Sequence, residues 1–200
     1  MKVMEERLQQ AVMGLFLELE ASARHVHLTK DQALRLFGHG LTPQRPLSQP
    51  GQFLARERVT VMGPKGKLER VAVLGPERKE AQVELSLTDA RALGIDAPIR
   101  LSGDVAGTPG CALEGPEGRL TLPQGVLVAQ RHIHLRPQDA EKFGVADKQV
   151  VALRTYTRRP TVFYDVVVRV SKDYAPYVHL DFDEANACGA SPGDLGRILT

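Results

Sequence analysis

A five-residue motif occurs twice in this 200-residue chain. The first copy is Arg24–Leu28 (RHVHL) and the second is Arg131–Leu135 (RHIHL). A short polar segment with the pattern of a helix follows each copy and ends near Phe-Gly, at residues 31–38 and 139–144. Self-similarity at this distance indicates two halves built to the same plan, and it limits the fold before composition is considered.

A second, shorter recurrence lies near the end of each half. Asp-Ala followed by an apolar residue and glycine occurs at residues 89–94, and a weaker version occurs at 183–189. Between the helical segments lie short β-branched runs bounded by Gly and Pro, such as 58–61, 70–74 and 162–170. No helical pattern after the first exceeds about three turns, which argues against a doubly wound α/β sheet. We therefore predict a mainly β protein with short helices, made of two tandem small β-barrel domains related by an internal repeat.

The predicted domain boundaries follow the repeat and the turn residues. Gly and Pro cluster between residues 104 and 118, where the first half ends. We expect an N-terminal amphipathic helix within residues 1–20, a first barrel over 21–106 and a second over 107–200. The helix is predicted at residues 2–17 from an apolar stripe with helical spacing, and it would pack on the body or serve in docking.

Composition places the chain among ordinary globular proteins. The residues are 42% hydrophobic and 25% charged, and the formal charge of +2 is too small to indicate a nucleic-acid or membrane surface. Glu5 and Glu6 stand where a signal peptide would be basic, and the apolar run is too short to span a membrane. Cys111 and Cys188 are far apart and give no sign of a disulfide framework. We expect a cytoplasmic protein that binds neither nucleic acid nor membrane.

Four histidines of the repeated motif point to metal. Residues i and i+2 of a strand lie on one face, so His25 and His27 would point together, as would His132 and His134. Two imidazoles on one strand are a common way to bind zinc. One such pair alone would more simply be two surface histidines. A second copy in the same Arg-flanked context favours a metal site.

The repeat also indicates the third ligand. Glu84 lies six residues before Ala90, and His179 lies six residues before Ala185, each at the end of an expected strand. The simplest interpretation is one site of His25, His27 and Glu84 and another of His132, His134 and His179; a shared two-metal site with mixed ligands stays open. His39 has no counterpart in the repeat and is expected to be a solvent-exposed histidine.

Three arginines recur near these motifs. Arg24 and Arg131 alternate with the motif histidines and are expected to form structural salt bridges or to contact a distal part of a ligand. Arg78 follows the Gly75-Pro76 turn just before the strand of Glu84. A guanidinium beside a zinc site is well suited to phosphate, although local sequence alone would favour a solvated charge.

Several segments together resemble the PduL-type phosphotransacylases, also called phosphate propanoyltransferases. The resemblance runs from about residue 20 to the end and keeps the order of the motifs. It is carried by Ser22–Leu28, Gly51–Phe53, Gly75–Glu84, Ser102-Gly103, Arg131–His134 and His179–Asn186. It implies two β-barrel domains, two zinc ions per chain, acyl-CoA and orthophosphate as substrates, the same two triads, and a phosphate-binding role for Arg78.

The activity that the resemblance implies is conversion of acetyl- or propanoyl-CoA plus phosphate into acyl phosphate plus CoA at a dinuclear zinc site. Zinc is thiophilic and can stabilise the leaving thiolate, while Arg78 and a second zinc can hold phosphate. Ser22 and Ala129, on the strands that lead into the two motifs, are the coenzyme A contacts implied by the resemblance. No Gly-rich loop precedes a helix, so a nucleotide-hydrolysing or dinucleotide-binding function lacks its motif.

The chain departs from the family pattern at two places. Phe182 replaces the more usual threonine after His179, a change next to the ligand rather than in it. Family members housed in bacterial microcompartments usually carry a longer N-terminal extension, whereas about one helix precedes the first barrel here. We therefore expect a free cytoplasmic enzyme, with the microcompartment lumen as the alternative location and no shell partner.

Two other functions remain open at this point. A dinuclear zinc hydrolase of thioesters or phosphoesters would present the same ligands, with water as the nucleophile. A metal-binding scaffold protein would bind zinc with every position closed and would not bind coenzyme A. The sequence leaves the acyl-chain preference and the oligomeric state open, a homo-oligomer included.

Overall fold

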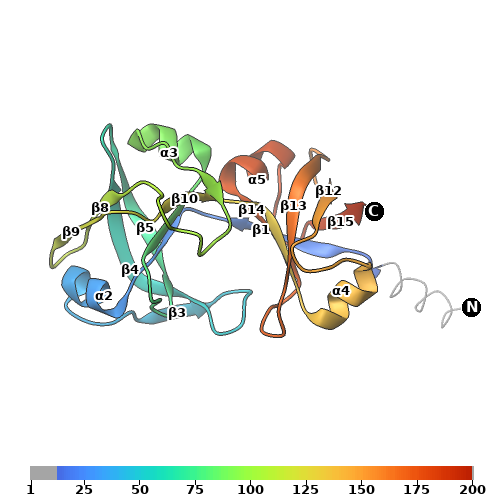
Figure 1. Ribbon diagram of the computed structural model, residues 1–200, viewed down its shortest axis with the longest axis horizontal. Coiled ribbons are helices and arrows are strands. Elements are labelled where there is room, and N and C mark those ends of the chain that lie inside the picture. Colours follow the sequence, from blue (N-terminus) through green and yellow to red (C-terminus); the bar gives the residue numbers. More distant parts are fainter. Residues whose placement is uncertain (1–12, 200) are drawn as a thin grey trace, which may run out of the picture. The chain divides into compact units, whose positions relative to one another are not determined.

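The computed structural model describes residues 13–199, which form two compact units (Figure 1). The N-terminal unit is Ala23–Gln130. The C-terminal unit combines Arg131 onwards with the residues that precede Ala23. Each unit has its own core of buried aliphatic side chains. The protein is mainly β, as predicted, with four short helices among the described residues.

The N-terminal unit is an open sheet in the order β7-β10-β6-β2-β5-β4-β8-β9, with β3 paired to β4. Its ends are β7, only two residues long, and β9. Such short edges offer too few ladder hydrogen bonds to close a barrel, so the expected barrel is absent from this unit. The strands are β2 (His25–His27), β3 (Pro43–Pro46), β4 (Phe53–Met62), β5 (Lys67–Gly75), β6 (Gln82–Leu85), β7 (Ile99–Arg100), β8 (Cys111–Glu114), β9 (Arg119–Leu122) and β10 (Val126–Ala129).

The C-terminal unit is a closed barrel in the order β1-β14-β11-β13-β12-β15. Closure removes the free edges, and the barrel interior is filled by side chains such as Ile133, Val168 and Val178. This unit agrees with the predicted small barrel. The strands are β1 (Leu17–Ser22), β11 (His132–Leu135), β12 (Val150–Tyr156), β13 (Val162–Val170), β14 (Tyr177–Asp181) and β15 (Leu195–Leu199).

The strands around the histidine motifs have the same order in both units. The order β10-β6-β2-β5-β4 in the N-terminal unit corresponds to β1-β14-β11-β13-β12 in the C-terminal unit. The directions also agree, since the first pair is parallel, the second antiparallel, the third parallel and the fourth antiparallel in each case. Both histidine motifs therefore lie between an antiparallel and a parallel neighbour.

A short helix follows each strand that carries a candidate ligand (Figure 1). Each helix ends at a glycine in the left-handed conformation, which a side chain would strain. Thr29, Ser86 and Asp181 accept backbone N–H groups at three of the four starts. These caps fix the direction in which the chain leaves the ligand strands. The helices are α2 (Lys30–Phe37), α3 (Leu87–Leu93), α4 (Pro137–Phe143) and α5 (Phe182–Cys188).

The strand that precedes each histidine motif in sequence belongs to the sheet of the other unit. Strand β1 precedes β2 in sequence but pairs with β14 and β15, and β10 precedes β11 but pairs with β6 and β7. The chain therefore passes between units at Ser22/Ala23 and at Gln130/Arg131. The structure divides at these points rather than at the expected boundary of 106/107, because strand pairing decides which unit a segment joins.

The expected N-terminal helix falls mainly on residues 1–12, which lie outside the described residues. Its expected last residue, Leu17, begins strand β1. Leu17 and Leu19 are buried while Glu18 is exposed, so a period of two describes this segment better than a helical period. Within residues 13–199, no helix has both the length and the apolar character needed to cross a bilayer.

Candidate metal centres

The N-terminal triad consists of His25, His27 and Glu84. Strands β2 and β6 are antiparallel neighbours, and their register places Glu84 directly opposite His25. Val26, between the two histidines, belongs to the core, so both imidazoles project from the other face of the sheet. All three side chains are buried, and one potential ligand atom from each lies within 4.8 Å of the others.

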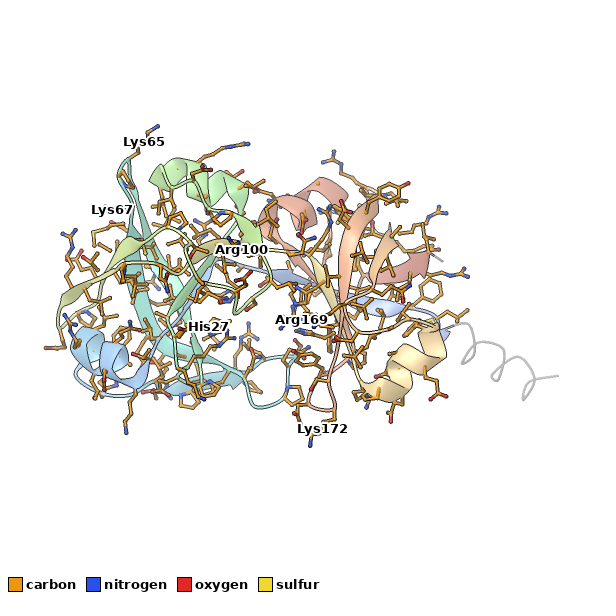
Figure 2. The ribbon with its side chains drawn as sticks, in the orientation of Figure 1. His27, Lys65, Lys67, Arg100, Arg169 and Lys172 are labelled. Carbon is orange, nitrogen blue, oxygen red and sulfur yellow. The ribbon has the colours of Figure 1, made fainter. Side chains whose placement is uncertain are left out.

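Backbone carbonyls orient both histidines of this triad. The Nδ1 atom of His25 lies 2.7 Å from the carbonyl oxygen of Ala23. The Nδ1 atom of His27, which projects from β2 (Figure 2), lies 3.3 Å from the carbonyl oxygen of Leu74. A carbonyl accepts hydrogen bonds only, so each Nδ1 carries a proton, and in the neutral imidazole Nε2 is then the nitrogen left for metal. Such outer contacts are typical of imidazoles that bind metal.

Hydrogen-bond donors orient the carboxylate of Glu84. The Ser102 hydroxyl donates to Glu84 Oε1 at 2.8 Å, and the side-chain amide of Gln82 donates to the same oxygen. Gln82 is fixed in turn by the backbone N–H of Gly103, which donates to its Oε1 at 2.7 Å. The sequence motifs alone assign no role to Gln82 or Ser102. Their presence in the segments that carry the family resemblance was the available signal.

Burial and neighbouring charges set the ionisation of this triad. Burial alone would lower the pKa of His25, but the charge of Glu84, 3.5 Å from its Nε2, raises that pKa overall. Burial lowers the pKa of His27 well below its ordinary value, and the charges of His25 and Arg78 lower it further. Burial opposes ionisation of Glu84, yet His25 holds its pKa well below the usual range. A neutral His27 and an ionised Glu84 are the forms that bind metal.

Arg78 lies close to the N-terminal triad. Its backbone N–H donates to the carbonyl of Leu28 at 2.8 Å, which ties the loop before β6 to the end of the first histidine motif. Its charge contributes to the lowered pKa of His27. The half-buried Arg78 is thus a cation beside a candidate metal site.

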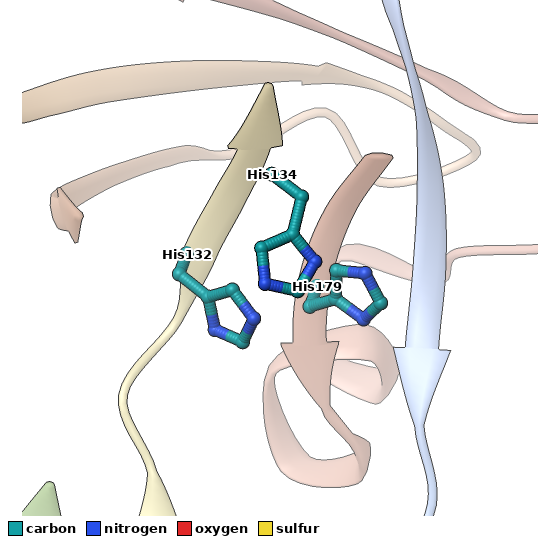
Figure 3. Close-up of side chains that lie close together, drawn as sticks. All are labelled: His132, His134 and His179. Carbon is teal, nitrogen blue, oxygen red and sulfur yellow. The ribbon is translucent and has the colours of Figure 1, made fainter. Parts of the chain in front are cut away.

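The C-terminal triad consists of His132, His134 and His179 (Figure 3). Strand β11 pairs with β14 in antiparallel register, so His179 lies directly opposite His132, as Glu84 lies opposite His25. The rings of His132 and His179 stack with their centroids 5.0 Å apart and their planes at 6°. One ring nitrogen from each histidine lies within 4.8 Å of the others.

An aromatic ring and a cation lie beside His134. The ring of Tyr174 stacks on His134 with a centroid separation of 4.1 Å. The guanidinium of Arg169, on β13 (Figure 2), lies over the Tyr174 ring at 5.9 Å. Arg169 is also the register partner of His134 across the parallel pair β11 and β13. These contacts limit the orientations that His134 can adopt.

Both motif arginines form salt bridges, which confirms one of the two roles expected for them. Arg24 contacts Asp89 of α3 at 3.1 Å, and Arg131 contacts Glu184 of α5 at 2.6 Å. The two acids occupy the third position of their helices. In each unit an arginine beside the histidine motif therefore binds the helix that follows the third candidate ligand.

The remaining predicted residues lie at strand ends or in loops. Ser22 is the last residue of β1 and Ala129 the last of β10, and both are half-buried where the chain leaves one unit for the other. The side chain of His39 is 59% exposed, as expected for a histidine outside the metal sites. Cys111 and Cys188 are both buried free thiols.

Comparison with known proteins places this geometry in context. A family model described as phosphate propanoyltransferase matches residues 18–191. A phosphate propanoyltransferase of Clostridioides difficile (strain 630) is 48% identical over 200 residues, covering 99% of this chain and 96% of that protein. One of Enterococcus faecalis (strain ATCC 700802 / V583) is 51% identical over 196 residues, covering 97% and 92%. A third, of Listeria monocytogenes serovar 1/2a, is 49% identical over 199 residues, covering 98% and 93%.

Proposed function

This chain belongs to the phosphate propanoyltransferase family, and from that premise we propose that it is an enzyme that transfers an acyl group between coenzyme A and orthophosphate. The proposed acyl groups are propanoyl and acetyl. The observation that carries the proposal is the pair of three-ligand clusters on equivalent strands, with Arg78 beside one of them.

We assign one zinc ion to each triad. Imidazole nitrogen and carboxylate oxygen are ordinary zinc ligands, and three protein ligands are the usual number when a fourth position must remain for substrate. The carbonyl contacts of His25 and His27 support this assignment, because they direct both Nε2 lone pairs away from the backbone. A purely structural zinc site would instead have four protein ligands and leave no coordination position for substrate.

Zinc bound at the triads would supply Lewis-acid stabilisation of the coenzyme A thiolate and of phosphate. Arg78 would hold phosphate through two parallel hydrogen bonds and offset negative charge as phosphate attacks the thioester carbonyl. The C–O bond to phosphate forms while the C–S bond breaks, so CoA leaves as thiolate. Ser22 and Ala129 are the proposed coenzyme A contacts.

The proposed reaction passes directly from thioester to acyl phosphate. A cysteine that carried the acyl group would have to be an accessible thiolate. Both thiols are buried, and burial raises the pKa of Cys111 to about 12 and raises that of Cys188 as well. These environments favour inert thiols over nucleophiles.

The strand order also supports our proposal that the two halves are repeats of one unit. Five successive strands have the same order and directions, and the third candidate ligand lies opposite the first histidine in both. Under this proposal β1 and β10 are equivalent strands, which makes Ser22 and Ala129 equivalent positions.

The test is a direct assay for acyl phosphate. Propanoyl-CoA or acetyl-CoA is incubated with and without phosphate, and acyl phosphate is trapped with hydroxylamine. Free CoA should appear together with acyl hydroxamate, only when phosphate is present, and zinc chelation should abolish both. Release of CoA without phosphate and without hydroxamate would instead identify a zinc hydrolase.

A further inference from the structure

The third candidate ligand needs hydrogen-bond donors around it in one triad and a hydrogen-bond acceptor in the other. Glu84 is a carboxylate, which accepts hydrogen bonds, and it receives them from Ser102 and Gln82. His179 is an imidazole, which can bind metal through one nitrogen while the other carries a proton. That N–H requires an acceptor, and a carboxylate is the acceptor that most strengthens a metal-bound imidazole.

Glu20 of β1 lies beside His179. Strands β1 and β14 are parallel neighbours, and their register pairs Glu20 with His179. Glu20 Oε2 is 3.7 Å from His179 Nε2, within ion-pair distance. Figure 3 shows β1, in light blue, next to the His179 side chain. The side chains are 33% and 13% exposed, so water screens this pair less than it would a pair on the open surface.

The N-terminal unit has no carboxylate at the corresponding position. Strand β10 occupies the place of β1 there, and its register pairs the fully buried Leu127 with Glu84. A second carboxylate beside Glu84 would repel it, whereas a carboxylate beside His179 attracts the imidazole N–H. The difference between Leu127 and Glu20 therefore matches the difference between the two third ligands.

We propose that Glu20 is a positioning residue for the C-terminal metal site. At 3.7 Å the two atoms are in ion-pair contact and not yet at hydrogen-bond distance. In the zinc-loaded chain Glu20 would accept the ring N–H of His179 and so fix the tautomer that presents the other nitrogen to metal. Its charge also offsets part of the +2 charge that three neutral histidines leave on zinc. Glu20 lies outside the group of three close ligand atoms, so it acts through His179. This inference rests on the proposed zinc site of the C-terminal triad.

The test measures zinc affinity at the C-terminal triad alone. In a His25→Ala chain, which keeps only that triad intact, Glu20→Gln is compared with Glu20→Asp and with Glu18→Gln by competition of Zn²⁺ with a chelator. Glu18 is exposed on the same strand, so its variant removes the same charge without contacting His179. We expect Glu20→Gln to weaken Zn²⁺ binding about 10- to 100-fold, Glu20→Asp to recover part of the loss, and Glu18→Gln to bind normally.

A second measurement follows the His179 proton itself. In the zinc-loaded, ¹⁵N-labelled protein, the ring N–H of His179 should give an NMR signal that exchanges slowly with water. In Glu20→Gln this signal should move to a different chemical shift and exchange faster. If His25→Ala does not fold, both measurements are made with the triads intact, where Glu20→Gln should weaken one of the two zinc-binding phases and leave the other at the parent value.

Three outcomes overturn the inference. Unchanged affinity and an unchanged ring N–H in Glu20→Gln would show that Glu20 does not position His179. An equal loss in Glu18→Gln would show a general effect of charge. If the parent chain binds no Zn²⁺ at His132, His134 and His179, the proposed metal site fails, and the inference fails with it for a different and recognisable reason.

Discussion

The two triads have the same backbone arrangement but different ligand chemistry. In both units the histidine motif lies between an antiparallel and a parallel strand, and the third candidate ligand lies opposite the first histidine. In the N-terminal unit that ligand is a buried carboxylate held by donors, and in the C-terminal unit it is an imidazole beside a carboxylate. Strand register thus places the candidate ligands, while neighbouring side chains differ in a way that suits a carboxylate in one unit and an imidazole in the other.

Removing a histidine from either triad should have the largest effect. Two remaining ligands bind zinc poorly, so His25→Ala and His134→Ala should each lose one of about two zinc ions per chain and nearly all turnover. Elemental analysis and the hydroxylamine assay measure both quantities. His39→Ala removes an exposed histidine and should keep both ions. Full metal content in either triad variant would contradict the assignment.

Arg78 should matter for phosphate and not for metal. We expect Arg78→Ala to lower the rate by about two to three orders of magnitude while zinc content stays at the parent value. Arg78→Lys should recover only part, because an ammonium cannot form the two-pronged contact. Kinetics with phosphate varied at saturating acyl-CoA provide the measurement, and Lys79→Ala is the neighbouring charge control. Parent-like phosphate kinetics in Arg78→Ala would make this residue an ordinary loop cation.

The donors to Glu84 should affect only the N-terminal site. Ser102→Ala removes the 2.8 Å hydrogen bond to Glu84, and we expect Zn²⁺ affinity there to fall about tenfold or more. The C-terminal site should retain its Zn²⁺ affinity. Titration with a chelator should therefore show two Zn²⁺-release phases, of which only one occurs at a lower chelator concentration than in the parent chain. The exposed Ser191→Ala is the control. Weakening of both phases would show that Ser102 stabilises the chain generally and does not orient Glu84.

The two motif arginines should differ modestly in how much each contributes to the free energy of unfolding. Arg131 bonds Glu184 and the carbonyl of Tyr164 and lies over the ring of Phe163, whereas Arg24 bonds Asp89 with its own side chain 39% exposed. We expect Arg131→Ala to lower the free energy of unfolding by about 2 kcal/mol and Arg24→Ala by about 1 kcal/mol.

Urea unfolding of the metal-free chain measures these losses, with exposed Lys172→Ala as the control. Equal losses in the two arginine variants would show that the additional contacts of Arg131 contribute nothing.

The candidate ligands could be predicted from sequence because their geometry is local. Residues i and i+2 share a face of any strand, and the repeat placed Glu84 and His179 at the same distance before a helix. The structure brings all six side chains together in the two predicted groups.

The pairing of β1 and β10 could not be predicted in the same way. Their apolar residues show that they are buried strands or helix segments but not which sheet they join, since that depends on partners far along the chain. Leu19 fits the apolar stripe of the predicted helix as well as a strand until β14 lies beside it. The contact of Ser102 with Glu84 was hidden for the same reason, because 18 residues separate them.

Zinc-edge anomalous diffraction from crystals of the full chain would locate both proposed metal ions. We expect two anomalous peaks, one bound by His25, His27 and Glu84 and the other by His132, His134 and His179, with ligand distances of about 2.0–2.2 Å. A single peak, or zinc bound instead by His39 or a cysteine, would contradict this assignment.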